Sequence, residues 1–530
     1  MNKTFIHKGF LAPLLLERGW DEVKLNQLRM KQNIINILSI LFLFLSMAGC
    51  KKFITKDVVG QYPESEFYKT SAQAVLAINA AYQPLGFTTA NNNRLWVFGD
   101  VASDDAAQGG RGPGDQGDID FIDQFNINAT NGNLASIWTL LYDGITRCNL
   151  VLSKVPAIEM DKNLQARILA EAKFLRSYYY FELTNIFGDV PIILTPLKPD
   201  ELQIPQSAVQ QIFETVIEPD LINAATNLPV SYSGKDVGRV TAGAATALLA
   251  KAYLFERKWD KAASTAAKIV NSNLYQLMPG YSQNFNQKFK NNKESVFEIQ
   301  HLTGQDPKLG NELNQYFAPF IDGGGYFFNA PTQNFVNEFE KTGAGIVDPR
   351  LDYTIGRDSM PWFNNKIFDK AWSPGTGYLT RKHQQPLAEV ANKSDGNLNY
   401  TAIRYADVLL WYAEALNESG HSADALIPLN LIRKRARESY LYDSLQVGYP
   451  NIPTGLLPDI TSPNQFDVRK QIQHERRVEL GFEFHRYFDI IRWGKVYAAQ
   501  AFSDKPNFNY DLYKHFPIPQ IERDRNKALH

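Results

Sequence analysis

Two segments far apart in the chain repeat one spacing of residues, and this repeat constrains the fold more than any other feature. Tyr253 precedes Ala262 by nine positions, and Leu416 precedes Ala425 by nine positions. A short turn follows the large residue in each copy. Large residues fill the gap between two antiparallel helices, and alanines let the helices approach closely. Two copies in the same register therefore predict stacked helix pairs.

The spacing is that of a tetratricopeptide repeat, which is a helix pair that stacks on neighbouring pairs. Other readable stretches also follow a helical period. From Ile168 to Phe187, apolar residues cover nearly every face, and Gly188 and Pro191 follow. This pattern predicts a buried helix that ends at the glycine. The sequence therefore predicts an all-α scaffold of tetratricopeptide-like helix pairs.

Two irregular segments, residues 87–133 and about 280–400, interrupt this helical pattern. Glycine, proline and asparagine break any period there, and aromatic residues are frequent in the second segment. Long irregular segments in a helical protein are usually functional or disordered, and the aromatic content argues against disorder. We therefore expect these long loops to bind the ligand.

The beginning of the chain predicts a lipid anchor. Lys31 is followed by an apolar run over residues 34–45 and by small residues immediately before Cys50. This order is typical of a lipoprotein signal peptide. A run of roughly a dozen apolar residues is too short to cross a bilayer, which needs about 20. We therefore predict cleavage before Cys50 and acylation of that residue, which would anchor the protein to a membrane.

The same pattern sets the predicted domain boundaries. Residues 1–29 carry acidic side chains where a signal peptide should be basic, so we interpret them as an upstream extension ahead of a true start at Met30. Residues 30–49 are the predicted signal peptide. Residues 50–530 are predicted to form a single domain, with the loop-rich insertion at about 280–400.

The charge balance excludes classes of partner. The 55 lysines and arginines are matched by 56 aspartates and glutamates, so no net field attracts nucleic acid or an anionic bilayer. Cys148 is the only cysteine besides Cys50, so no disulfide is expected. No phosphate-binding loop of the Gly-Lys-Ser/Thr type is present. We expect no cofactor.

The sequence gives little support for a catalytic or a metal-binding site. Glu475, Glu479 and Glu483 recur at every fourth position and need cations, which Arg476, Arg486, Arg404 or Arg433 could supply. The alternative is a pair of glycoside hydrolase carboxylates, which must lie roughly 5 to 9 Å apart across a sugar cleft. His474 begins no zinc-protease motif because position 478 is valine. We therefore expect no catalytic residues and no resident metal.

Asp100, Asp104 and Asp105 form an acidic group within the first irregular segment. Carboxylate oxygens of this kind can hold calcium. Aspartates also cap helices and turns, and we favour that role here.

Several ordered blocks resemble one family, the SusD/RagB-like outer-membrane nutrient-binding lipoproteins of Bacteroidota. The most specific blocks lie in the family's order along the mature chain: Gly99-Asp100-Val101-Ala102-Ser103-Asp104, Glu171-Ala172-Lys173-Phe174-Leu175-Arg176, Gly188-Asp189-Val190-Pro191, Gly238-Arg239-Val240-Thr241, Glu294-Ser295-Val296-Phe297-Glu298, Arg404-Tyr405-Ala406-Asp407, Glu475-Arg476-Arg477 and Phe516-Pro517-Ile518-Pro519. The resemblance implies a SusD-like scaffold of four tetratricopeptide-like helix pairs that carries the irregular loops.

The resemblance also implies a function. Such proteins are lipid-anchored at the outer membrane, face outward, capture oligosaccharides, and deliver them to a TonB-dependent transporter of the SusC type. Binding of peptides or other nutrients by the same machinery stays open as an alternative, and a glycoside hydrolase is a more remote one.

A sugar-binding site needs exposed aromatic rings beside polar side chains, because sugar C–H faces pack on rings and hydroxyls form hydrogen bonds. Trp96, beside Asn93 and Arg94, is our first candidate. Tyr326, Trp362 and Trp372 are further candidates from the central loops. The alternative for Trp96 is burial, because it lies within the apolar run 95–98.

Overall fold

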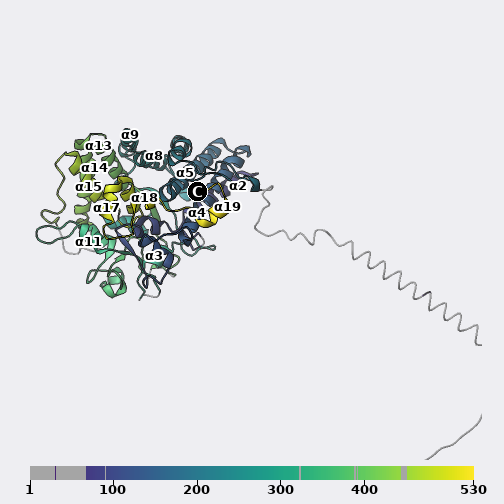
Figure 1. Cartoon of the computed structure of the whole chain (residues 1–530). Coiled ribbons are helices and arrows are strands. Elements are labelled where there is room, and N and C mark those ends of the chain that lie inside the picture. Colours follow the sequence, from purple (N-terminus) through teal and green to yellow (C-terminus); the bar gives the residue numbers. More distant parts are fainter. Residues whose placement is uncertain are drawn as a thin grey trace, which may run out of the picture. The chain divides into compact units, whose positions relative to one another are not determined.

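The long helices pack on one another in chain order and form the upper part of the unit Tyr68–His530 in the computed structural model (Figure 1). They are α2 (Ser71–Tyr82), α4 (Gly132–Lys154), α5 (Lys162–Phe187), α7 (Glu218–Asn227), α8 (Ala242–Phe255), α9 (Trp259–Val270), α13 (Tyr405–Glu418), α14 (Ser422–Glu438) and α15 (Gln465–Leu480). The structure describes residue 30 and residues 67–89, 91–320, 324–386, 389–390, 392–442 and 451–530.

Local signals explain where the central helix α5 begins and ends. Asp161 precedes it, and its carboxylate accepts a hydrogen bond from the backbone N–H of Leu164 at 2.8 Å. At the other end Gly188 has a φ of 73°, a conformation that glycine adopts without strain. The helix is buried along most of its length, as its apolar pattern predicts.

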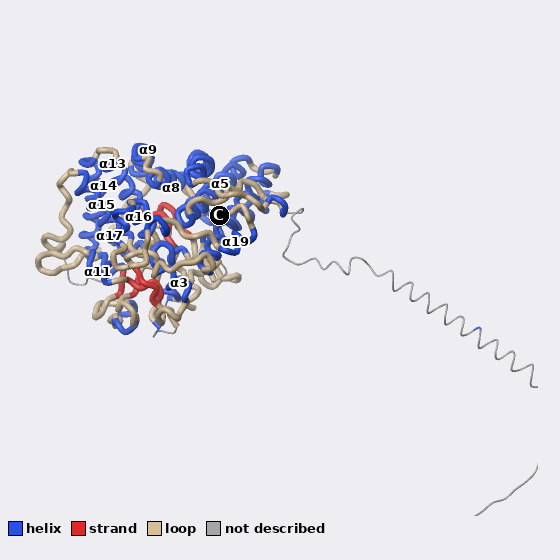
Figure 2. Tube along the Cα trace, viewed as in Figure 1, coloured by secondary structure: helices blue, strands red, loops and turns tan. Residues whose placement is uncertain are grey.

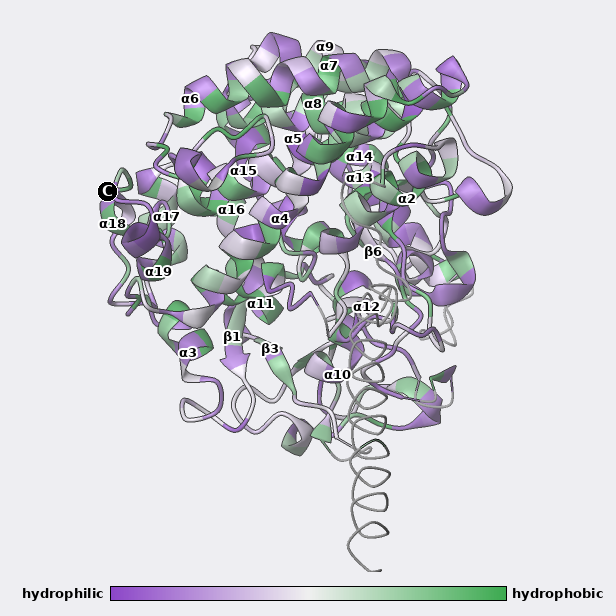
Figure 3. Cartoon of the chain, turned by 90° about the vertical axis from the view of Figure 1, so that its right-hand side faces the viewer, coloured by the Kyte–Doolittle hydropathy of each residue, from purple (hydrophilic) through white to green (hydrophobic). Residues whose placement is uncertain are grey.

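The two predicted helix pairs are confirmed. The first is α8 with α9, the second is α13 with α14, and α9 also packs on α13. The repeat alanines Ala262 and Ala425 are buried at the helix contacts. In Figure 3, α7, α8 and α9 each carry hydrophobic and hydrophilic stretches, as expected for helices with one buried face. The predicted all-α scaffold of tetratricopeptide-like helix pairs is therefore confirmed.

The chain between α9 and α13 holds only short elements among its described residues. These are β2 (Ser295–Ile299), α10 (Leu313–Phe317), β3 (Phe328–Pro331), α11 (Gln333–Glu338), α12 (Arg350–Thr354), β4 (Ile355–Gly356), β5 (Leu379–Thr380) and β6 (Tyr400–Arg404), with short 3-10 turns between them. β2 pairs with β6, and β4 pairs with β5, in both cases antiparallel. Loops dominate the lower part of the unit in Figure 2.

One small sheet joins the two irregular segments. β1 (Ala106–Gly109) pairs antiparallel with β3, so that Ala107 lies opposite Ala330 and Gly109 lies opposite Phe328. Figure 3 shows β1, β3 and α10 together below the long helices. Loops that are distant in sequence therefore meet on one side of the scaffold.

Within the described residues, no helix is both long and apolar enough to span a membrane. Cys50 and the predicted signal peptide, apart from Met30, lie outside the described residues. The lipid anchor and the predicted domain boundaries therefore stay predictions.

Candidate functional site

A group of aromatic side chains lies where the two irregular segments meet. Tyr316, in α10, forms an edge contact with Tyr326, with 5.6 Å between ring centroids. The backbone N–H of Tyr326 donates to the carbonyl of Gln315 at 2.9 Å. Gly325 allows this close turn, because a Cβ there would lie 2.0 Å from the carbonyl oxygen of Ala318. The backbone thus fixes the two rings beside each other.

Arg94, from the first irregular segment, completes this group. Its guanidinium carbon lies 4.5 Å from the centroid of the Tyr316 ring. Its buried Nη1 has no hydrogen-bond partner among the described residues, and its charge interacts with the carboxylate of Glu312 without a close ion pair. A buried N–H without a partner is costly, so Arg94 is a donor available to a ligand.

A second pair extends the same surface. The Phe320 side chain is 52% exposed, and the guanidinium of Arg111 lies 5.1 Å from its ring centroid. The Tyr326 side chain is 43% exposed. We call Arg94, Arg111, Tyr316, Phe320 and Tyr326 the aromatic platform. It offers ring faces and cationic donors side by side, which suits recognition of sugars.

The expectation that Trp96 is an exposed platform is wrong, and the alternative of burial is correct. Trp96 is fully buried, and its ring packs against Tyr316, Phe317 and Phe328 at centroid distances of 5.9, 5.4 and 6.3 Å. The apolar run 95–98 is helical and directs this ring into the core. Trp96 therefore supports the platform from beneath.

Asn93 is also buried, and its side chain forms hydrogen bonds with the backbone. Its Nδ2 donates to the carbonyl of Leu85 at 3.1 Å, and its Oδ1 accepts from the N–H of Leu95 at 3.1 Å. Of the three candidates at 93–96, only Arg94 lies on the platform.

Trp362 and Trp372 belong to a neighbouring apolar cluster. Trp362 is 5% exposed and packs with Phe327, Phe368 and Leu379, while Trp372 is half-buried against them. Because Phe327 directly follows Tyr326, this cluster adjoins the platform. This cluster stabilises the loops. Of the three candidates predicted in the central loops, Tyr326 is the one with an exposed side chain.

Tyr316, Phe320 and Arg111 were missed as site residues. The sequence showed aromatic crowding around 316–328, but no local pattern paired Tyr316 with Tyr326. The close backbone approach at Gly325 and the β1–β3 pairing create the platform, and both depend on tertiary structure.

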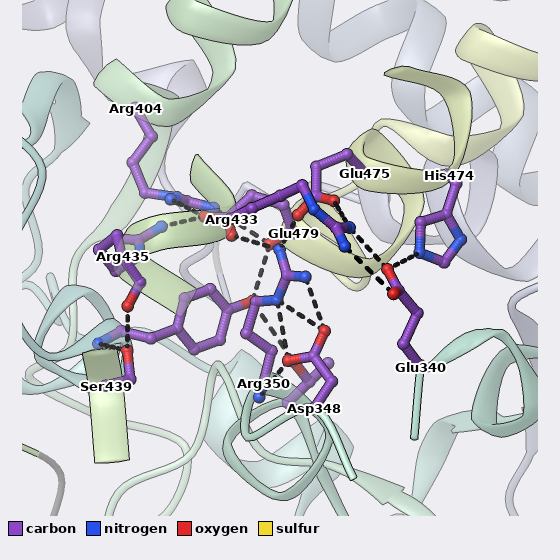
Figure 4. Close-up of polar contacts among 12 residues, drawn as sticks. Glu340, Asp348, Arg350, Arg404, Arg433, Arg435, Ser439, His474, Glu475 and Glu479 are labelled. Carbon is purple, nitrogen blue, oxygen red and sulfur yellow. Dashed lines mark hydrogen bonds and ion pairs between the residues drawn. The ribbon is translucent and has the colours of Figure 1, made fainter. Parts of the chain in front are cut away.

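Glu475 and Glu479 of α15 belong to a buried ion-pair cluster (Figure 4). Glu483, three residues beyond the end of this helix, belongs to the same cluster. Arg404 binds Glu479 and Glu483 at 2.9 and 2.8 Å, and Arg433 binds Glu475 at 3.0 Å. These two arginines were among the predicted partners. Three partners were missed, namely Arg350, Lys382 and Arg435. The other two predicted partners, Arg476 and Arg486, bind different aspartates.

This cluster leaves no free carboxylate for acid or base catalysis. Glu475 and Glu479 are completely buried, and Glu483 is nearly so. Burial alone would raise the pKa of Glu479, but the nearby guanidinium groups of Arg435, Arg404 and Arg350 lower this pKa to about 2. Glu475, Glu479 and Glu483 therefore serve as structural partners of buried cations.

His474 belongs to the edge of the same cluster. Its Nδ1 lies 2.6 Å from Glu338 and its Nε2 lies 3.2 Å from Glu340. Burial opposes the charged imidazole, but these two carboxylates raise the pKa of His474 to about 9. Ligand atoms of Glu340, His474 and Glu475 lie within 4.8 Å of one another. A metal would have to displace the proton of His474 and the guanidinium of Arg433, which binds both glutamates.

The acidic group at 100–105 is structural, but Asp104 and Asp105 form ion pairs where the sequence favoured a helix-capping or turn role. Asp104 binds Arg486 at 2.8 Å, and Asp105 binds Arg477 at 2.7 Å. Both oxygens of the buried Asp100 carboxylate accept hydrogen bonds, from Nδ2 of Asn329 at 2.9 Å and from the backbone N–H of Phe484 at 3.1 Å.

Two family models match the chain. One, described as the SusD family, matches residues 293–530, and the other, described as starch-binding and associating with the outer membrane, matches residues 87–254. The chain belongs to the SusD/RagB-like family. Its scaffold of helix pairs and its ordered sequence blocks agree with this membership.

Individual relatives are similar over most of their length. SusD-like protein P2 of Formosa agariphila is 27% identical over 513 residues, covering 93% of this chain and 98% of the relative. A solved laminarin-binding SusD-like protein is 28% identical with a TM-score of 0.73, covering 87% of this chain and 99% of that one. Surface glycan-binding protein A from Bacteroides fluxus is 25% identical with a TM-score of 0.71, covering 86% and 97%.

Proposed function

We propose that this SusD-like protein binds oligosaccharides on the aromatic platform without chemically changing them. The observation that carries the proposal is the exposed Tyr326 ring beside Tyr316, whose other neighbour is the guanidinium of Arg94. Rings pack on sugar C–H faces, and a guanidinium donates to hydroxyls. The similarity to a laminarin-binding protein and to a surface glycan-binding protein supports this choice of ligand.

We further propose that Cys50 is acylated and that the protein delivers glycans to a SusC-like TonB-dependent transporter at the outer membrane, facing outward. The lipoprotein pattern of residues 30–50 and the description of the matching family support this part. Cys50→Ala should move the protein from the detergent phase to the aqueous phase in a partitioning experiment. Co-purification of a transporter with the wild-type protein would test the partner.

Tyr326→Ala tests the platform. We expect binding of laminarin oligosaccharides, measured by calorimetric titration, to weaken at least tenfold, which corresponds to about 1.4 kcal/mol. The matched control is Tyr442→Ala, because Tyr442 is 58% exposed and lies just after α14. Equal binding by wild type and Tyr326→Ala would contradict the platform. Binding of peptides in place of any glycan would favour the alternative nutrient.

A further inference from the structure

A cavity of about 200 Å³ lies among the loops between α9 and α13. Its wall includes Asn286, Gln287, Phe363, Arg381, Gln384 and Gln385. Since a water molecule takes about 30 Å³ of liquid, this space exceeds a hydration site and can hold a small ring. A smaller pocket shares Phe363, Gln384 and Gln385 with it.

Arg381 lines this cavity as a buried cation that forms no ion pair among the described residues. Its guanidinium is buried, and its carbon lies 4.5 Å from the ring centroid of Phe363 and 5.3 Å from that of Trp362. Its Nη1 donates to the carbonyl of Pro361 at 2.9 Å. Among the described residues no carboxylate lies within 4 Å of it, because Asp352 pairs with Arg357. Burial lowers the pKa of Arg381 to about 10, and the nearby negative charge of Asp352 opposes this shift only in part.

Gln385 supplies a hydrogen-bond donor without a partner at the same cavity. Its Oε1 accepts from the backbone N–H groups of Asn397 and Leu398 at 2.6 and 2.9 Å, so the side chain is fixed. Its Nε2 is buried and has no hydrogen-bond partner within the described part of the chain. A buried amide N–H without a partner favours a ligand that accepts a hydrogen bond. Glu389 also lines the cavity, but it is exposed and its Oε2 accepts from Gln287 at 2.7 Å.

We propose that this cavity binds a carboxylate-bearing sugar, a uronic acid residue. Arg381 pairs with the carboxylate, the Nε2 of Gln385 donates to a sugar oxygen, and the ring of Phe363 forms an apolar wall. A guanidinium matches a carboxylate in shape as well as charge, and desolvation strengthens the pair. A neutral sugar would leave Arg381 unpaired.

The smaller pocket, which shares part of its wall with the cavity, borders the same short segment of chain as the platform. Ala318 lines the smaller pocket, and its carbonyl accepts from the N–H of Phe327 at 3.1 Å, while Tyr316 and Tyr326 of the platform flank this contact. The inference therefore rests on the proposed glycan binding and specifies its substrate class. One oligosaccharide with an acidic residue would contact both places.

Calorimetric titration of the full chain with D-glucuronate, its methyl ester and inorganic sulfate tests the proposal. We expect glucuronate to bind at least tenfold tighter than the ester, and Arg381→Gln to remove this preference. Equal binding of the acid and the ester would overturn the proposal. Sulfate binding as tight as that of glucuronate would also overturn it, because the cavity would then be a general anion site.

Gln385→Glu gives an independent result if Arg381→Gln fails to fold. A glutamate keeps the acceptor oxygen for Asn397 and Leu398 and places a negative charge in the cavity. We expect at least a tenfold loss of glucuronate binding in protein that a thermal melt shows to be folded, because the new carboxylate repels that of the ligand. Unchanged binding would overturn the proposal. Tyr326→Ala should leave glucuronate binding intact, so failure of the platform and failure of the cavity give different results.

Discussion

Arginines play opposite roles in two regions of this protein. Arg350, Arg404 and Arg433 are buried in the ion-pair cluster, and each binds at least two carboxylates. Arg94 and Arg381, on the loop side, lie over aromatic rings and have no carboxylate within 4 Å among the described residues. Paired buried charges hold the scaffold together, whereas unpaired donors remain available to a ligand.

The largest effect should come from breaking the cluster with Arg404→Met. This change leaves Glu294, Glu479 and Glu483 with one cation fewer inside the core. We expect a loss of about 5 kcal/mol in the free energy of unfolding, because removing one partner of a buried ion pair strands the others. Urea unfolding measures it. The control is Lys495→Met, whose exposed pair with Asp511 should contribute almost nothing. Similar stabilities for the two variants would contradict the structural role of the cluster.

Trp96→Ala should show that the ring directly beneath the platform belongs to the hydrophobic core. Truncating this fully buried ring beneath Tyr316 should cost about 3 to 5 kcal/mol of stability, because it leaves a cavity in the core. Tyr326→Ala, at the surface, should cost far less. Thermal melts of both variants make the comparison. A small loss for Trp96→Ala would mean that the ring is not part of the core.

The difference between the two regions also explains what the sequence could predict. Helix pairs follow from local spacing, so Ala262 and Ala425 could be placed correctly. The regular recurrence of Glu475 and Glu479 showed that cations were needed, and two of the predicted arginines supply them. Trp96 could not be placed, because an aromatic residue in a short apolar run fits both a buried ring and an exposed one. Its burial depends on Tyr316, about 220 positions further along the chain.

His474, at the edge of the cluster, predicts a pH dependence. Its pKa is raised from 6.5 to about 9 in the folded state, so its contribution is complete below pH 6.5 and is lost as the pH rises through 9. We expect wild type to exceed His474→Gln by about 2 kcal/mol at pH 6, with most of this difference gone at pH 10. Urea unfolding at the two pH values measures it. A difference that does not change with pH would mean that His474 is neutral in the folded protein.

The smallest stability effect should come from Arg94→Met, on the loop side. The variant loses the contact between the guanidinium and Tyr316, which is worth about 0.5 to 1 kcal/mol at such a site. It also removes a buried N–H that has no partner among the described residues. Removing this N–H stabilises the folded state and offsets the lost contact with Tyr316. We therefore expect a melting temperature close to that of wild type and at least tenfold weaker binding of laminarin oligosaccharides. Destabilisation on the scale of Arg404→Met would instead place Arg94 with the structural arginines, and the distinction between the two regions would fail.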